Sequence, residues 1–120
     1  MWCVVRSRSA VDDRGSTAAE FAVALPAVIL VLGACLGALG VVSQQLRLQD
    51  AAADAARGLG RGETESVVAE RVQAALAGAS IARHEDGELV CVRLSAPAAG
   101  PAAIAGLRLV ASSCALDGGR

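Results

Sequence analysis

Apolar residues fill one long block near the start of the chain. The 22 positions from Phe21 to Val42 carry no charged side chain, and the nearest acid, Glu20, stands where the block begins. A helix rises about 1.5 Å per residue, so this block would span about 33 Å, enough to cross the hydrocarbon core of a bilayer. The pattern therefore predicts a transmembrane helix over residues 16–42.

The pattern changes after the block. Residues 43–79 mix Ala, Gln and charged side chains, which predicts a helical extension and then a second helix that starts near Thr64 as its cap. A Gly-rich hinge is expected between these helices, near 58–62, because glycines make a helix costly there. Val68 and Val72 fall on one face of the second helix, as expected if it packs on the strands that follow.

The last segment, residues 80–120, has shorter apolar runs that are separated by turn residues. Its apolar runs predict strands over residues 81–84, 89–94 and 107–114. Asp86-Gly87 lies between the first two runs and is a strong cue for a hairpin, with a strict two-residue turn or a slightly longer loop. The expected fold is α+β: a long N-terminal transmembrane helix followed by a short helix and a small antiparallel sheet of about three strands.

Two features modify the apolar helix. Pro26 removes one helical hydrogen bond and should bend the helix one turn inside the membrane. Gly33, Gly37 and Gly40 place small residues on one stripe, which would allow another helix to approach closely, although such a stripe is a weak signal in an Ala/Gly-rich segment.

Composition argues against several functions. The net charge is −1 and no basic run occurs, so there is no electrostatic case for nucleic acid. The one histidine, His84, lies beside Arg83 and Glu85 in an expected turn, and no paired acids or nucleophile motif accompany it. We therefore expect a non-enzyme without metal, cofactor or small-molecule substrate.

The start of the apolar block carries a more specific signal. The string Gly15-Ser-Thr-Ala-Ala-Glu-Phe-Ala-Val-Ala-Leu-Pro26 resembles the type IV prepilin-like families, and most closely the TadE-like minor pilins or pseudopilins of tight-adherence systems. The resemblance implies that a membrane-embedded prepilin peptidase cuts after Gly15 and leaves Ser16 as the new N-terminus. It also implies an assembly role for Glu20 and Phe21, with Glu20 pairing with the free amine of a neighbouring subunit.

The same resemblance sets the expected topology. Arginines before and after the helix balance, so charge alone does not orient it. By resemblance, residues 1–15 are a cytoplasmic leader and residues 80–120 a small extracytoplasmic β-rich region of a single-pass bacterial membrane protein. The implied partners are other pilin-like subunits, assembly-platform proteins, the prepilin peptidase and the lipid bilayer.

The cysteines divide among these compartments. Cys3 lies in the leader and Cys35 in the membrane block, which leaves Cys91 and Cys114 outside, on candidate strands. An oxidising location favours a disulfide between them, and the alternative is two small buried apolar residues.

Other interpretations of the apolar block remain open. Leu32-Gly33-Ala34-Cys35 resembles a lipobox, which would make the protein a lipoprotein or membrane-anchored binding module lipidated at Cys35. Against this, the chain stays apolar beyond Cys35. For Glu20, the alternative is an ordinary interfacial charge that marks where the membrane begins, although Gly15 before it favours the assembly role. The leading hypothesis is a TadE-like minor pilin of a tight-adherence type IV pilus or related secretion apparatus.

Overall fold

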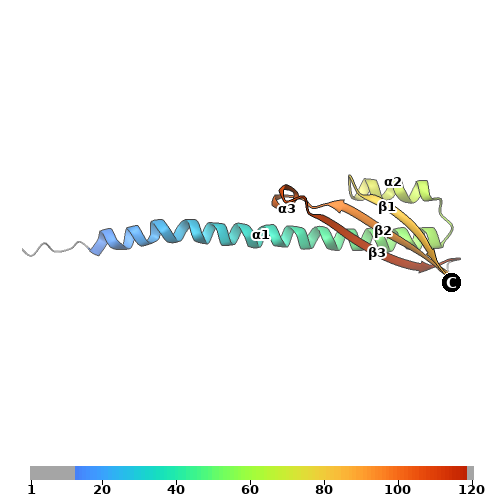
Figure 1. Ribbon diagram of the computed structural model, residues 1–120, viewed down its shortest axis with the longest axis horizontal. Helices are drawn as coiled ribbons and strands as arrows, with labels where there is room; N and C mark the ends of the chain where they lie inside the picture. Colours follow the sequence, from blue (N-terminus) through green and yellow to red (C-terminus); the bar gives the residue numbers. More distant parts are fainter. Residues whose placement is uncertain (1–12, 119–120) are drawn as a thin grey trace, which may run out of the picture. The chain divides into compact units, whose positions relative to one another are not determined.

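The structure, a computed structural model, describes residues 13–118. Its elements follow in the order α1 (Asp13–Gly60), α2 (Glu65–Ala75), β1 (Ser80–Asp86), β2 (Leu89–Pro97), α3 (Pro101–Ile104) and β3 (Arg108–Leu116) (Figure 1). The chain forms two units, of which the first ends at Cys35 and the second begins at Leu36, both within α1. The expected fold class is confirmed: a long apolar helix, a short helix and a three-stranded antiparallel sheet.

The first unit contributes the N-terminal part of α1. Every residue from Gly15 to Cys35 is exposed, including the large apolar side chains of Phe21, Leu25 and Ile29. Among the described residues, α1 is the one helix long and apolar enough to cross a membrane. It stays helical through Pro26.

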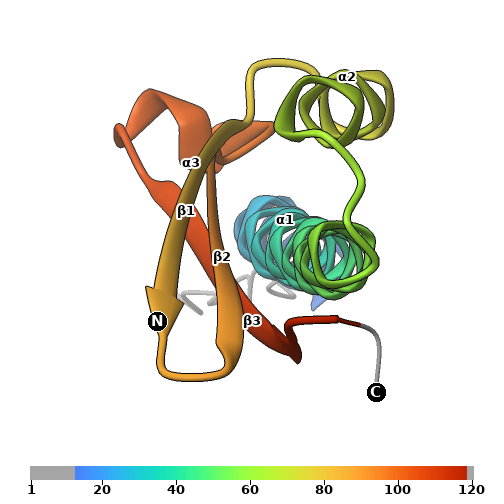
Figure 2. The ribbon, with the colours of Figure 1, turned by 90° about the vertical axis from the view of Figure 1, so that its right-hand side faces the viewer.

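The second unit has its core on one face of α1. Leu48, Ala52, Ala55 and Leu59 recur every three or four residues and are buried. They pack in one cluster with Val68 and Val72 of α2 and with the inner face of the sheet, whose buried members are Val90, Val92, Leu94, Ala96, Leu109 and Ala111. Figure 2 shows α1 and α2 on the same side of this sheet. The alternation along β2 and β3 is that of strands with one face covered.

The sheet has the order β1-β2-β3, with each neighbouring pair antiparallel. Asp86 pairs with Leu89, so the hairpin between β1 and β2 turns at Gly87 and Glu88. Gly87 has φ +63°, and no non-glycine residue in the described chain has a positive φ. A two-residue turn with a positive φ at its first position alone is of type II′, which takes Gly at that position.

The glycines in the last turn of α1 are closely packed. α1 continues through Gly58 to Gly60, and both are buried. A Cβ atom at position 60 would lie 2.6 Å from the carbonyl oxygen of Leu116 in β3. Gly62 follows with φ +87° and carries the chain into Thr64, the cap of α2. Thr64 makes no side-chain hydrogen bond to the helix backbone.

The connection between β2 and β3 contains an element that the sequence analysis did not expect. Pro101–Ile104 forms the single turn α3, which starts after Gly100 with φ +68°. The chain closes the connection with a hydrogen bond from the Ala98 amide to the Leu107 carbonyl. The segment is therefore an ordered loop that returns to the sheet.

Candidate functional site

The residues of the expected processing and assembly site lie at the N-terminal end of α1. Gly15 and Ser16 lie near the start of the described part of this helix, Asp13–Gly60. The first twelve residues of the expected leader, Cys3 among them, lie outside the described residues.

Glu20 and Phe21 are one turn further along and both are exposed, Phe21 by 65 %. Among residues 15–118, no ion pair joins Glu20 to another side chain. Its carboxylate is thus available to a cation from outside the described chain. The role expected from the resemblance, pairing with a neighbouring subunit, stays a prediction.

The three glycines of the expected packing stripe have different surroundings. Gly33 and Gly40 are exposed, and a Cβ atom at either position would meet nothing within 4 Å. Gly37 is half-buried, and a Cβ atom there would lie 4.0 Å from Cγ of Pro101 in α3. The chain itself therefore occupies part of the surface at Gly37.

Two glutamines directly after the apolar block connect α1 to the sheet. The Gln44 amide nitrogen donates to the Pro97 carbonyl at 2.9 Å, and its oxygen accepts from the Ala99 amide at 2.8 Å. Gln45 donates to the Val110 carbonyl on the outer edge of β3 at 2.9 Å. The sequence analysis gave these glutamines no role, although a Gln pair at the end of an apolar run was a visible signal.

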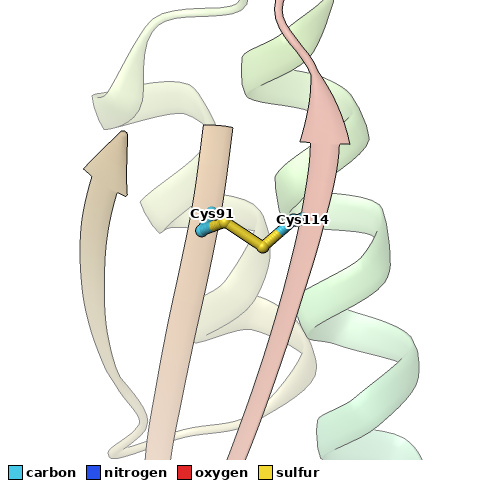
Figure 3. The surroundings of a disulfide bond; sticks show 2 residues. All are labelled: Cys91 and Cys114. Carbon is cyan, nitrogen blue, oxygen red and sulfur yellow. A yellow bond between two sulfur atoms is a disulfide. The ribbon is translucent and has the colours of Figure 1, made fainter. Parts of the chain in front are cut away.

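A disulfide joins Cys91 and Cys114, which face each other across β2 and β3 (Figure 3). Cys91 is buried to 2 % exposure, whereas Cys114 is exposed. The bond lies on the side of the sheet opposite the core, because the buried residues of β2 at even positions point the other way. Cys35 is a free, exposed cysteine on α1.

The turn between α1 and α2 holds a small charge network. The Glu63 carboxylate accepts from Arg61 at 2.8 Å and from Arg71 at 2.9 Å. These two hydrogen bonds, that from Arg61 foremost, lower the pKa of Glu63 below its usual value of 4.5. Within residues 13–118 there is no group of three His, Cys, Asp or Glu side chains that could hold a metal ion.

The family match found by comparison with known proteins lies within α1. Residues 15–57 match the model of the family described as TadE-like protein. The chain is also 38 % identical over 77 residues to a protein named apoptosis inhibitor Rv3655c from Mycobacterium tuberculosis, a match that covers 64 % of this chain and 62 % of that protein. No solved structure matches the chain. Residues 15–57 of the chain therefore match the TadE-like family, in agreement with the resemblance seen in the sequence from Gly15 to Pro26.

Proposed function

We propose that this protein is a minor pilin-like subunit of a tight-adherence type IV pilus or a related secretion apparatus. In this proposal a prepilin peptidase cuts after Gly15, and α1 holds the mature chain in the membrane as a single span. The leader is cytoplasmic and the sheet is extracytoplasmic. Assembly-platform proteins then transfer the subunit from the membrane to neighbouring pilin-like subunits.

The observation that carries the proposal is the coincidence of the TadE-like segment with an uncovered apolar helix. Residues 15–57 match the family, and within them every residue from Gly15 to Leu36 is exposed. An apolar helix surface of this size needs lipid or other helices around it. Before assembly, lipid surrounds this surface. After assembly, the helices of neighbouring subunits surround it.

When neighbouring subunits replace lipid around α1, Glu20 fixes the axial position of one subunit relative to the next. A carboxylate at the edge of the hydrocarbon is unfavourable, with a cost that rises to roughly 2.5–3.5 kcal/mol at the bilayer centre. A neighbouring subunit that begins at Ser16 brings a free α-amine, which compensates this cost in only one axial position. Apolar contacts along the helices have no such preference for one register.

The competing proposal, a lipoprotein processed at Cys35, fits the fold less well. The cut would fall between Ala34 and Cys35, in the middle of the continuous helix α1. The residues that follow, Leu36–Val42, would remain as a helical apolar segment directly after the lipid anchor. Incorporation of labelled palmitate at Cys35 is the result that would favour this alternative.

The assembly role of Glu20 can be tested in cells that express the complete secretion apparatus. We expect Glu20→Ala and Glu20→Gln to enter the membrane at wild-type levels but to disappear from sheared filaments or from the crosslinked subunit complex. Glu65→Ala, which removes an exposed acid from α2, is the matched control and should assemble normally. Wild-type incorporation of Glu20→Gln would show that the charge of Glu20 has no part in assembly.

A further inference from the structure

The loop between β2 and β3 is apolar and exposed. Residues 98–107, here called the apolar loop, consist only of Ala, Gly, Pro, Ile and Leu. Ile104 is 91 % exposed and Leu107 is 48 % exposed. Turns in contact with water are rich in polar residues, and exposed apolar surface of this kind marks an interaction site.

The apolar loop is fixed against α1 by contacts within the second unit. Gln44 holds its beginning through the Pro97 carbonyl and the Ala99 amide. Further along, Pro101 lies near Gly37 of the helix, since a Cβ atom at position 37 would be 4.0 Å from its Cγ, and Ala102 packs against the core. Figure 1 shows α3 beside α1 at the end of the sheet where β2 stops. The loop therefore extends along α1 from Gln44 back to Gly37, towards the N-terminus of the helix.

This placement sets the level of α3 relative to the apolar block. Gly37 lies five residues before Val42, where the block ends, which corresponds to about 8 Å along the helix. Interfacial segments of membrane proteins bury their apolar side to a depth of about 5–10 Å. α3 is thus level with a part of α1 that belongs to the membrane if the block spans it.

Two arginines near the loop also fit a position at the membrane surface. The first charged residue of α1 after the block is Arg47, and Arg108 follows the loop directly. Arg108 donates to the Ser95 hydroxyl, and Arg47 is exposed. Arginine side chains at a membrane interface lay their apolar stems along the hydrocarbon edge and keep their charged heads in the headgroup region, and the exposed Arg47 is suited to this position.

We propose that the apolar loop inserts into the outer boundary of the lipid bilayer, with Ile104 and Leu107 among the acyl chains. The occupant is lipid rather than a second copy of the chain, because the loop lies level with a part of α1 whose apolar side chains, Leu36 and Leu39 among them, are themselves exposed. The inference rests on the proposed membrane span of α1. The sheet would then be attached to the membrane at a second point besides its helix.

The test uses single tryptophans in the full-length protein, reconstituted at low density in phosphatidylcholine vesicles. Trp2→Phe is included in every variant, because Trp2 is the one native tryptophan. Ile104→Trp and Leu107→Trp are the loop probes. Leu30→Trp reports on the apolar block, and Val67→Trp on α2, where Val67 is 47 % exposed, is the control outside the membrane. Quenching is compared between brominated lipids and aqueous iodide.

We expect the two loop probes to behave like Leu30→Trp: a blue-shifted emission that brominated lipids quench and iodide does not. Iodide quenching of both loop probes equal to that of Val67→Trp would overturn the inference, as would shielding from both quenchers, which would indicate a protein surface over the loop. If Leu30→Trp itself escapes brominated lipid, the membrane span of α1 fails first. The two failures are therefore distinguishable.

Discussion

At the residue scale, the close approach of α1 and β3 depends on the absence of a side chain at Gly60. The carbonyl oxygen of Leu116 would lie 2.6 Å from a Cβ atom there, and this oxygen is backbone that cannot rotate away. The sequence showed a cluster of glycines and predicted a hinge. It could not show that one of them makes a contact with a strand more than fifty positions away, because that contact exists only once the sheet has formed.

Gly60→Ala should destabilise the second unit by about 1–3 kcal/mol, the usual cost of forcing extra volume into a packed site. Gly40→Ala is the matched control on the same helix, since a Cβ atom there meets nothing within 4 Å. It should leave stability unchanged or raise it by up to about 1 kcal/mol, because Ala favours helix over Gly. Urea unfolding in detergent, followed by circular dichroism, measures both, and equal stabilities would contradict the contact.

A second residue-scale prediction concerns pH. The folded protein lowers the pKa of Glu63 below 4.5, so the ionised carboxylate contributes stability above about that pH and loses it as the pH falls through the folded-state pKa. Glu63→Gln should therefore be less stable than wild type at pH 7, and the difference should shrink as the pH is lowered from about 5 to about 3, a range that includes the usual pKa of 4.5.

The control for this pH dependence is Glu70→Gln, which removes an exposed acid of α2 that has no ion pair among the described residues. It should change stability little at pH 7. Unfolding curves measured across the pH range give the comparison. A Glu63→Gln difference that stays constant down to pH 3 would show that the two arginines do not act through the charge of Glu63.

At the scale of elements, hydrophobic period and turn residues were enough to predict the two longer helices and the three strands. The expected strands at 81–84, 89–94 and 107–114 correspond to β1, β2 and β3, each of which extends further. The hairpin turns one residue later than Asp86-Gly87 suggests, because pairing of Asp86 with Leu89 places Gly87 first in the turn. α3 was not predicted, since a four-residue helix has no measurable period and its helical turn is fixed by Pro101 and the contact with Gly37.

The disulfide is the element-scale feature that should contribute most to stability. It closes a loop with a sequence separation of 23 residues between β2 and β3. The chain-entropy model gives such a loop roughly 3 kcal/mol, a large share for so small a domain. The double variant Cys91→Ala/Cys114→Ala should lose about that amount in chemical unfolding.

Reductant supplies the control for the disulfide prediction. It should destabilise the wild-type protein to the level of the double variant and leave the double variant itself unchanged. Alkylation after denaturation, followed by mass spectrometry, verifies that both thiols are free, with the unpaired Cys35 counted separately. Wild-type protein that keeps its full stability after complete reduction would contradict a stabilising role.

At the scale of the whole molecule, the sequence predicted the two main parts: a long apolar helix and a small sheet that carries a disulfide. The family resemblance rested on about a dozen residues from Gly15 to Pro26, and the matching family covers residues 15–57. The contacts that tie α1 to the sheet, through Gln44 and Gln45, could not be predicted. They depend on which carbonyl groups of distant strands remain unpaired when the fold is complete.

The central claim is that this chain is processed as a prepilin, and one measurement tests it most directly. The protein is expressed with its native prepilin peptidase, extracted from the membrane, and analysed for its intact mass and N-terminal sequence. We expect a chain that begins at Ser16, and an uncut product from a Gly15→Leu control. A chain that remains uncut with active peptidase, or that begins at a lipidated Cys35, would contradict the account.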